Sequence, residues 1–479
     1  MAEEPIILWF RRDLRLTDQA AVAAAAASGR PVIPVFILDD GADGLRPLGG
    51  ASNWWLDKSL KAMGRELESR GSRLIVRRGA SHEVLSTIAR ETGARTAVWG
   101  RSYEPGARER DANVRARLES AGLQVEEAPG AFLVEPGRVL NGSGQPYRIF
   151  APWWRAAQKQ LGQVRLTAAP ARLRAPTVWP ESLPPSDWRL HPTKPDWSTG
   201  FSWSAGEAAA QARLTAFMAD GASRYHQSRD LPAEAGSTRL SAHLAWGEIG
   251  PRQIYVAAHN ADIGQEARDK LLSEVAWRDF NHQLLAAYPE VVDTPFRPEF
   301  AALPVRDAPE ELEAWRRGRT GYPIVDAGMR ELWITGWMPN RLRLIAGSFL
   351  VKHLLIDWRE GERFFWDTLI DADPANNPLN WQWIAGSGPD AQPFNRIFNP
   401  LLQAGKFDGQ GLYVRRWLPE LAALPDHLIH QPWRATAAEL EAAGVRLGES
   451  YPRPLVDHGA ARDRALTAYK AVRQGPEKA

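Results

Sequence analysis

The chain has 479 residues, of which 44% are hydrophobic and 24% charged, as in ordinary globular proteins with two or three domains. Its formal net charge is only +2, so any surface that binds nucleic acid must be a local basic patch. Cysteine is absent, which excludes disulfides, thiolate metal sites and thiol catalysis and suits a reducing cytoplasm. No segment has the order of a signal peptide or the length of an apolar membrane span.

Tryptophan is unusually frequent, with 21 tryptophans against 15 phenylalanines and 9 tyrosines. Most of them are expected to fill the core. We expect the remainder to stack on ligands or to carry electrons.

Short apolar runs alternate with helical patterns over the first 130 residues. The runs are 6–10, 32–38, 73–79, 96–100 and 123–128, and the helical patterns lie near 18–28, 52–70, 81–92 and 105–121. Strands joined by helical crossovers imply a doubly wound, mainly parallel sheet that is covered on both faces. We therefore predict an α/β domain over 1–130.

Polar side chains follow three of these strands, where parallel sheets bind ligands. They are Arg11, Arg12 and Asp13 after the first strand, Asp39 and Asp40 after the second, and Arg101, Ser102 and Tyr103 after the fourth. No GxGxxG opens the first helix and no GxxxxGK[ST] occurs. The usual dinucleotide and P-loop sites are therefore not predicted.

The rest of the chain is expected to be a linker followed by helices. Residues 131–202 are assigned to the linker, because 165–200 is rich in proline and has little periodicity. From 203 to 479 we predict an all-α domain with helices near 204–220, 238–246, 251–259, 264–287, 308–317, 323–335, 339–356, 361–369 and 412–420.

A run of small and hydroxylated residues precedes the helical pattern near 238–246. Its backbone N–H groups and hydroxyls are suited to binding phosphate at a helix N-terminus. An ordinary helix cap explains the same residues when the segment is taken alone. The run comprises Gly236, Ser237, Thr238, Arg239, Leu240 and Ser241.

Two later helical patterns carry charged residues for which we expect a functional role. Glu274 and Trp277 are three residues apart and share a helix face. A solvated face explains the neighbouring Arg278 but gives Glu274 no role. In the pattern that begins at Asn340, two arginines oppose the helix macrodipole and should have anionic partners unless they are exposed. They are Arg341 and Arg343, and Arg343 could pair with Asp371.

The stretch 357–400 mixes polar groups with large aromatic side chains. A buried polar group needs a partner, and this mixture is typical of a pocket for a flat, polar, aromatic ligand. The residues are Asp371, Asp373, Asn376, Asn377, Asn380, Trp381, Trp383 and Arg396.

Three motifs give the chain a resemblance to a known family. DADPANNPLNWQW, with GWMPNRLR upstream and FNRIFNP downstream, closely resembles the photolyase/cryptochrome flavoproteins, and within them the microbial members that repair cyclobutane pyrimidine dimers. WFRRDLRLTD matches the opening of the family. The resemblance implies an α/β antenna domain followed by an all-α domain that binds FAD and DNA.

The resemblance also implies residue roles. FAD, bound non-covalently and active as the reduced anion, would contact Tyr225, Ser237, Thr238, Arg239, Leu240, Ser241, Arg343, Asp371, Asp373 and Asn377. The dimer and its DNA strand would contact Glu274, Trp277, Arg278, Asn340, Arg341, Trp383, Arg396 and Gln403. Glu274 would stabilise charge on the dimer, Asn377 would lie opposite flavin N5, and no metal site is expected.

The family's photoreduction relay of three tryptophans is matched only in part. Trp381 and Trp358 match its first two members, but the third position falls at Val305. Valine cannot form a stable radical, so the usual exit to the surface is interrupted. The residues that could provide a detour are Trp315, Trp333 and Tyr322. Leu344 replaces a methionine common in the family and could alter the dimer pocket.

The function implied is light-driven DNA repair. Excited reduced FAD would transfer an electron to a flipped-out pyrimidine dimer, whose cyclobutane ring opens before the electron returns. A cryptochrome-like blue-light photoreceptor without repair activity is the alternative. Plant-type cryptochromes carry aspartate where this chain has Asn377, and the chain shows no long tail after the family-like region. A flavin oxidoreductase is a third reading, but neither a nicotinamide site nor an acid/base pair is found.

The remaining expectations concern the second chromophore and the partners. The antenna is expected to be methenyltetrahydrofolate, since 49–60 resembles folate-binding members, with deazaflavin as the alternative. Ala107 sits where such members often place a glutamate, with Glu104 and Glu109 near. We expect a monomer that acts on UV-damaged DNA, without membrane contact, in a bacterial-type cytoplasm at the nucleoid.

Overall fold

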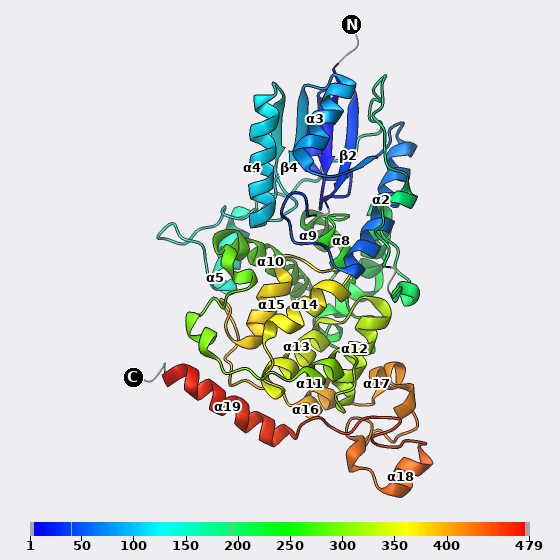
Figure 1. Ribbon diagram of the computed structural model, residues 1–479, viewed down its shortest axis with the longest axis vertical. Helices are drawn as coiled ribbons and strands as arrows, with labels where there is room; N and C mark the ends of the chain where they lie inside the picture. The colour runs from blue at the N-terminus through cyan, green and yellow to red at the C-terminus, as the bar shows by residue number, and fades with distance from the viewer. Residues whose placement is uncertain (1–3, 40, 193–194, 475–479) are drawn as a thin grey trace.

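The structure is a computed structural model that describes residues 4–39, 41–192 and 195–474. A sheet domain lies at the top of Figure 1 and a larger helical domain lies below it. The sheet domain contains β1 (Ile6–Phe10), β2 (Val32–Leu38), β3 (Ile75–Arg78), β4 (Thr96–Gly100), β5 (Gln124–Ala128), α1 (Ala20–Ala27), α2 (Gly50–Ser69), α3 (Ser81–Thr92) and α4 (Pro105–Ser120).

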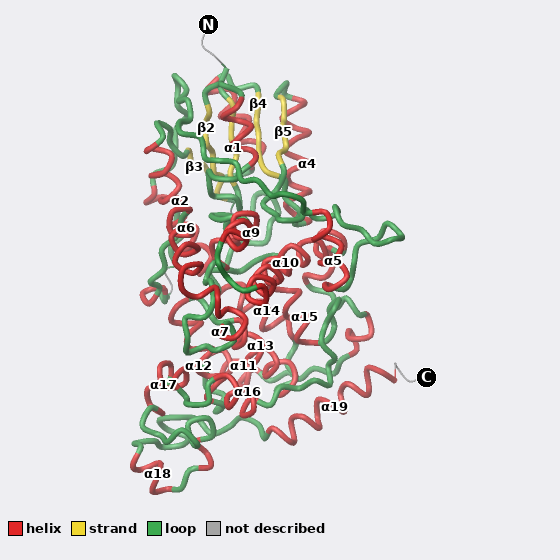
Figure 2. Tube along the Cα trace, turned by 180° about the vertical axis from the view of Figure 1, so that it is seen from behind, coloured by secondary structure: helices red, strands yellow, loops and turns green. Residues whose placement is uncertain are grey.

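The sheet is parallel, with the strand order β3-β2-β1-β4-β5. Every residue of the central strand β1 is buried, as expected for a strand that is covered on both faces. Ile7 and Trp9 pack against α3 and α4, whereas Leu8 and Phe10 pack with α1 and α2. Figure 2 shows α1 on the opposite side of the sheet from α3 in Figure 1. The doubly wound fold is therefore confirmed.

The helical domain is built around two hydrophobic cores. One gathers α5, α6, α9 and α10, and the other gathers α12 to α17 with α19. Helix α15 packs against α10, α13 and α14 and so lies between the two cores. The bounds are α5 (Phe150–Gln160), α6 (Glu207–Ala216), α7 (Tyr225–Ser228), α8 (Ser241–Ala245), α9 (Pro251–Asn260), α10 (Gln265–Ala287), α11 (Pro309–Arg316), α12 (Pro323–Thr335), α13 (Asn340–Ser348), α14 (Trp358–Thr368), α15 (Asn376–Ala385), α16 (Pro400–Phe407), α17 (Leu412–Trp417), α18 (Ala437–Ala442) and α19 (His458–Gln474).

The predicted elements are largely present. β1, β2, β4, α3 and α12 have the predicted bounds. The helix predicted over 339–356 is α13 followed by a π-helical turn, Phe349–His353. Helix α5 lies inside the range 131–202 that was assigned to the linker. Helices α15, α16, α18 and α19 were not predicted. Helix α15 was not recognised in the sequence because its amides and tryptophans obscure the helical periodicity. Asp373 nevertheless accepts hydrogen bonds from two backbone N–H groups at its start.

A buried carboxylate joins the two domains. Glu248 follows α8 and is fully buried. Its Oε1 accepts hydrogen bonds from Ser59 Oγ at 2.6 Å, Trp55 Nε1 at 3.2 Å and the Gly206 backbone N–H at 2.8 Å. Its Oε2 pairs with the ring of His243. Helix α2 of the sheet domain is thereby bound to the start of the helical domain.

Replacing Glu248 with alanine leaves several buried donors without an acceptor. Breaking a buried polar pair from one side costs about 3–5 kcal/mol. We expect the free energy of unfolding in urea to fall by this amount. Glu119→Ala, at a half-exposed position on α4, is the control and should change it by less than about 0.5 kcal/mol. A loss below about 1 kcal/mol for Glu248→Ala would contradict the interdomain role.

Candidate functional site

The predicted phosphate-binding segment forms a tight turn at the start of α8. A Cβ on Gly236 would lie 2.4 Å from the backbone oxygen of Ser228, so this close approach requires glycine. Arg239 has a φ of 51°, in the left-handed region that non-glycine residues rarely adopt. Its guanidinium lies 5.2 Å from the ring of Trp337, and Trp337 Nε1 donates to Ser241 Oγ at 3.1 Å. Protein contacts therefore fix the shape of the turn.

The other residues of this part of the chain that were predicted to contact FAD differ in how deeply they are buried. Tyr225 begins α7, its ring lies 5.6 Å from the Arg229 guanidinium, and burial raises the pKa of its phenol. Leu240 is fully buried in the core. Ser237 and Thr238 are partly buried, and Thr238 Oγ1 accepts the Leu240 N–H at 3.3 Å. The hydroxylated residues are thus the accessible ones.

Asp371 combines an ion pair with a buried carboxylate oxygen that has no partner among the described residues. Arg343 Nη2 donates to Asp371 Oδ2 at 2.7 Å, as the sequence led us to expect, and Arg343 Nε donates to the Met338 oxygen at 2.8 Å. Asp371 Oδ1 is buried and has no hydrogen-bond partner among the described residues. Such an atom requires a donor. A ligand with a ring N–H, such as the isoalloxazine of FAD, fits this requirement.

The amide of Asn377 is fixed in one direction. Asn377 is buried on α15, and its Nδ2 donates to the Glu362 backbone oxygen at 3.0 Å and to Glu362 Oε1 at 2.8 Å. Both N–H groups of the amide are thereby used. The amide oxygen remains to accept a hydrogen bond, so the side chain acts as an acceptor toward a ligand.

Asp373 is satisfied within the protein. Its Oδ1 accepts the backbone N–H groups of Ala375 and Asn376 at 2.9 and 2.7 Å, and its Oδ2 accepts from His282 Nε2 at 3.1 Å. Burial would raise the pKa of this carboxyl, but the charge and hydrogen bond of His282 hold the pKa well below its usual range. Asp373 therefore fixes the start of α15. Its direct contact with FAD stays a prediction.

Glu274 and Trp277 share one face of α10, as their spacing predicts. Glu274 Oε1 accepts from Arg229 Nη1 at 2.6 Å and from Lys270 Nζ at 2.8 Å. The ring of Trp277 stacks on Phe150 with centroids 4.0 Å apart and an interplanar angle of 10°. Trp277 is only partly buried. One face of the ring is thus supported, and the side chain is still accessible.

Arg278 lies apart from this pair. Its Nη1 donates to the Ala131 oxygen at 3.2 Å and to Asp279 Oδ1 at 3.0 Å, and its guanidinium lies 5.0 Å from the ring of Phe132. One residue further along a helix turns a side chain by about 100°. Arg278 therefore faces the sheet domain, and this position does not support its predicted contact with DNA phosphate.

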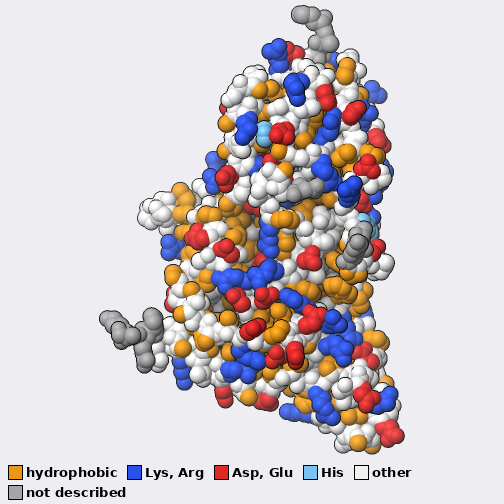
Figure 3. All heavy atoms as spheres, viewed as in Figure 1, with side chains coloured by type: hydrophobic (Ala, Val, Ile, Leu, Met, Phe, Trp, Pro, Cys, Tyr) orange, Lys and Arg blue, Asp and Glu red, His pale blue; other side chains and the backbone are white. Residues whose placement is uncertain are grey.

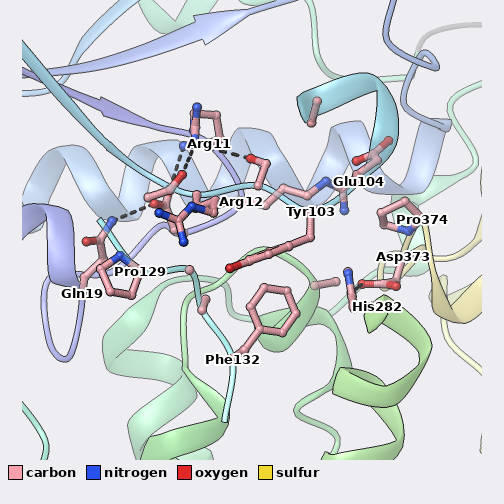
Figure 4. Close-up of a pocket in the computed structure, with 18 of the residues that line it drawn as sticks. Arg11, Arg12, Gln19, Tyr103, Glu104, Pro129, Phe132, His282, Asp373 and Pro374 are labelled. Atoms are coloured by element: carbon pink, nitrogen blue, oxygen red, sulfur yellow. Dashed lines mark hydrogen bonds and ion pairs between the residues drawn. The ribbon is translucent and has the colours of Figure 1, made fainter. Parts of the chain in front are cut away.

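Arg278 lines a small polar cavity at the carboxyl edge of the sheet, where the strand order reverses between β1 and β4. Figure 4 shows this cavity, with Tyr103 lying across it and Phe132 below. The cavity measures about 150 Å³. Most of the residues predicted at the strand ends line it, namely Arg11, Arg12, Asp13, Arg101, Ser102 and Tyr103. Asp39 is not in the lining, and Asp40 lies outside the described residues.

The residues predicted to meet the DNA strand are accessible to different degrees. Asn340 and Arg396 are exposed, whereas Trp383 and Gln403 are partly buried. Arg341 is also partly buried, and its Nη2 pairs with a carboxylate oxygen of Asp230, the expected anionic partner.

A buried lysine holds the segment that carries Arg396. Lys352 lies in the π-helical turn, is fully buried, and donates from Nζ to the Arg396 backbone oxygen at 2.9 Å. Its ammonium lies 5.3 Å from the ring of Phe394. Burial, with a further contribution from the charge of Arg396, lowers the pKa of Lys352 to about 7.

Trp381 is buried beside two other aromatic rings. Its ring centroid lies 6.2 Å from that of Trp315 and 5.0 Å from that of Phe365. A Cβ on Gly361 would lie 2.1 Å from the Trp381 ring, so α14 approaches this ring only because position 361 is glycine. Trp358 is also buried.

The candidates for a relay detour lie in different surroundings. Trp315 contacts Trp381 and is fully buried. Trp333 is exposed and stacks on Trp197, while Tyr322 packs on Phe349. Trp315 is therefore the candidate that this geometry supports.

A second cavity, of about 390 Å³, lies between the two domains. Figure 3 shows basic side chains gathered at mid-height on this face, at the level of α14 and α15 in Figure 1. The guanidinium of Arg46 lies 4.1 Å from the ring of Trp366 in this cavity. Its lining includes Leu45, Arg46, Glu104, Leu285, Val292, Arg359, Glu362, Arg363 and Trp366.

Several residues of the site were not predicted from the sequence. Contacts between segments that are distant in the sequence bring three of these residues to the site, namely Glu362, Arg46 and His282. Arg229 and Asp230 lie within RYHQSRDLPAE, close to the predicted Tyr225, but no spacing rule links them to partners on other helices. Lys352 carries a weak signal, since a lysine inside the apolar run FLVKHLL is unusual.

The described residues contain no group of three or more histidine, cysteine, aspartate or glutamate side chains placed to hold a metal ion. Within the same residues, no helix combines the length and apolarity needed to traverse a bilayer.

Comparison with known proteins identifies the family. Residues 6–175 match the family described as DNA photolyase, and residues 271–471 match the FAD binding domain of DNA photolyase. The chain is 48% identical to a deoxyribodipyrimidine photo-lyase of Agrobacterium fabrum, over 98% of each chain. It is 36% identical to Cryptochrome-2 of Arabidopsis thaliana, over 98% of this chain and 80% of the relative.

A solved structure agrees with this assignment. The crystal structure of a bacterial class III photolyase from Agrobacterium tumefaciens superimposes with a TM-score of 0.95 at 47% identity, over 99% of each chain. The resemblance inferred from the sequence motifs is therefore confirmed.

The lowered pKa of Lys352 predicts a pH-dependent contribution to stability. The ordinary pKa of a lysine is 10.5. Between pH 7 and pH 10.5 the unfolded chain therefore binds more protons at Lys352 than the folded protein does, so the free energy of unfolding rises with pH. Relative to Lys352→Met, the wild type should gain on the order of 1 kcal/mol per pH unit above pH 7. Urea unfolding at pH 7 and 8.5 measures this, with exposed Lys159→Met as the control. Equal slopes for the wild type and Lys352→Met would contradict the shift.

Proposed function

The chain belongs to the DNA photolyase and cryptochrome family, and from this premise we propose that it is a deoxyribodipyrimidine photo-lyase that splits cyclobutane pyrimidine dimers in light. Bound FAD, when reduced and excited, would supply the electron that opens the cyclobutane ring. The protein's part is to bind and orient both the cofactor and the dimer. The observation that carries the proposal is the presence of two hydrogen-bond acceptors without donors among the described residues, Asp371 Oδ1 and the amide oxygen of Asn377.

These two hydrogen-bond acceptors favour the reduced form of FAD over the oxidised form. A reduced flavin carries an N–H at N5, whereas oxidised flavin has an acceptor there. Because both N–H groups of Asn377 are bound by Glu362, its amide oxygen can accept from N5–H. Asp371 Oδ1 would accept a second ring N–H. An amide has no proton to release readily, so this environment suits the reduced anion. Around the remainder of FAD we place Tyr225, Ser237, Thr238, Arg239, Leu240, Ser241, Arg343 and Asp373.

The substrate cavity is proposed to lie beside α10 and α15. Trp277, supported from behind by Phe150, and Trp383 would form its two aromatic walls. Glu274, held by Arg229 and Lys270, would hydrogen-bond the base edge. The flanking DNA strand would be contacted by Asn340, Arg341, Arg396 and Gln403, which position the backbone without reading its sequence.

Electrons for reducing the flavin are proposed to pass through Trp381. Trp358 is the family's next member. Trp315 offers the second branch, because its ring is 6.2 Å from Trp381.

The antenna is proposed to be a folate in the interdomain cavity. A folate has a pterin edge with N–H donors and a tail with carboxylates. Glu104 can accept from the pterin, and Arg359 and Arg363 can bind the tail, within a cavity that measures about 390 Å³, a size in the usual range for ligands. The cavity at the carboxyl edge of the sheet offers less room for the alternative, a deazaflavin. That space measures about 150 Å³ and is crossed by Tyr103.

A light receptor without repair activity is the second candidate, because a plant cryptochrome is 36% identical over nearly the whole chain. Asn377 favours repair. We propose that the enzyme acts as a monomer on UV-damaged DNA, in the cytoplasm at the nucleoid.

The proposal is tested by mixing the chemically reduced holoprotein with an oligonucleotide that contains one thymine dimer, in blue light and in the dark. Loss of the dimer only in the light is expected. An intact dimer after illumination, with reduced FAD present, would favour the receptor. A 6–4 photoproduct oligonucleotide, which should remain unrepaired, is the control.

Trp277→Ala should weaken binding of the dimer oligonucleotide by about 1–3 kcal/mol, since base–aromatic stacking contributes this amount. Filter binding or fluorescence anisotropy in the dark measures the affinity. Trp179→Ala, a tryptophan of the sheet domain whose ring lies 4.6 Å from the Arg73 guanidinium, is the matched control. If Trp277→Ala binds like the wild type, Trp277 does not line the dimer cavity.

A further inference from the structure

An arginine of the sheet domain reaches into the flavin site through one intermediary. Arg46 lies in the segment between β2 and α2. Its Nη1 donates to Glu362 Oε1 at 2.7 Å and its Nη2 donates to Glu362 Oε2 at 2.9 Å. The Glu362 side chain is 5% exposed and that of Arg46 38%. The ion pair thus contains two hydrogen bonds, and its carboxylate is buried.

The same carboxylate sets the direction of the Asn377 amide. Glu362 Oε1 accepts from Arg46 Nη1 and from Asn377 Nδ2, at 2.7 and 2.8 Å. A continuous set of contacts therefore runs from the sheet domain to the amide proposed to face flavin N5. Trp366 supports the guanidinium from the side at 4.1 Å.

We propose that Arg46 is a positioning residue that controls the redox state of the flavin from the other domain. It holds Glu362 as an oriented carboxylate, which can only accept hydrogen bonds. Asn377 must then present its N–H groups to Glu362 and its oxygen to the flavin. The inference rests on the proposed function only in placing Asn377 beside N5.

Loss of the arginine removes this constraint. Without two matching donors, the carboxylate can rotate, and the fixed geometry of a guanidinium is not reproduced by other side chains. Asn377 then keeps only the Glu362 backbone oxygen as a fixed acceptor, so its amide turns more easily and can present an N–H to N5. That donor suits oxidised flavin, whose N5 is an acceptor, so the balance between the oxidised and reduced forms shifts toward oxidised.

The test uses the FAD-loaded protein without DNA. Arg46→Met and the wild type are equilibrated with a reference redox dye, and the ratio of oxidised to reduced flavin is read from the absorption spectrum. We expect the ratio to rise about two- to tenfold in the variant, the effect of one hydrogen bond of ordinary strength. Arg70→Met is the matched control, because Arg70 donates two hydrogen bonds to Glu66 in the same domain. It should leave the ratio unchanged.

Arg46→Lys keeps the charge but loses the two-bond geometry, so it should give an intermediate ratio. If Arg46→Met fails to retain FAD, Arg46→Gln, which lacks the charge but keeps hydrogen-bonding capacity, is measured instead. A wild-type ratio in the FAD-retaining variant overturns the inference.

Asn377→Ser, measured in parallel, separates the inference from the proposed function. A shift in Asn377→Ser without one in Arg46→Met rejects the role of Arg46 and leaves Asn377 beside the flavin. Failure of the wild type to repair DNA rejects the proposed function, and the redox comparison still decides the role of Arg46.

Discussion

Glu362 places a negative charge inside the protein, between Arg46 of the sheet domain and Asn377 of α15. Moving a carboxylate out of water costs several kcal/mol unless donors surround it. Here the donors come from both domains, so this charge is satisfied only when the domains are docked and α15 is in place. The relative position of the domains and the direction of the Asn377 amide are consequences of one requirement.

The rest of the interface has a different character. Around α2, Trp54 and Trp55 pack with Phe201, Trp203 and His243 of the helical domain, with Glu248 as the buried acceptor. Apolar burial there supplies adhesion that does not depend on direction. The pair of Arg46 and Glu362, together with the hydrogen bonds of Glu248, supplies the direction. An interface built in this way can keep the interdomain cavity open beside Arg46 and Glu362 while apolar packing around α2 maintains its stability.

The sequence predicted what depends on local pattern. Strands β1, β2 and β4 follow from continuous apolar runs, and the DADPANNPLNWQW motif located Asp371 and Asn377. It could not predict which oxygen of Asp371 would remain unpaired, or that Glu362, fifteen residues before Asn377, would hold its amide. Those facts depend on tertiary contacts. The contacts of Arg278 with Ala131, Asp279 and Phe132 could not be predicted for the same reason, and its contact with DNA phosphate stays a prediction.

The tryptophan excess has a structural explanation that narrows the search for functional rings. A buried indole both fills volume and donates a directed N–H. Many indoles here bond an acceptor far away in the sequence. The pairs are Trp55 with Glu248, Trp153 with Gln283, Trp203 with Thr335, Trp315 with Ala346, Trp337 with Ser241 and Trp366 with Pro47. Phenylalanine could not make such links.

Apart from Trp315, which also lies beside Trp381, these indoles are therefore accounted for as hydrogen-bonded links between segments. Trp277 and Trp383 are not among these links, and both keep part of their surface accessible. Accessible indoles retain a large apolar surface in contact with water. A stacked base would cover that surface, and the proposed flipped-out dimer supplies such a base. The requirement that buried charge be paired and the requirement that apolar surface be covered thus both support the proposed substrate site.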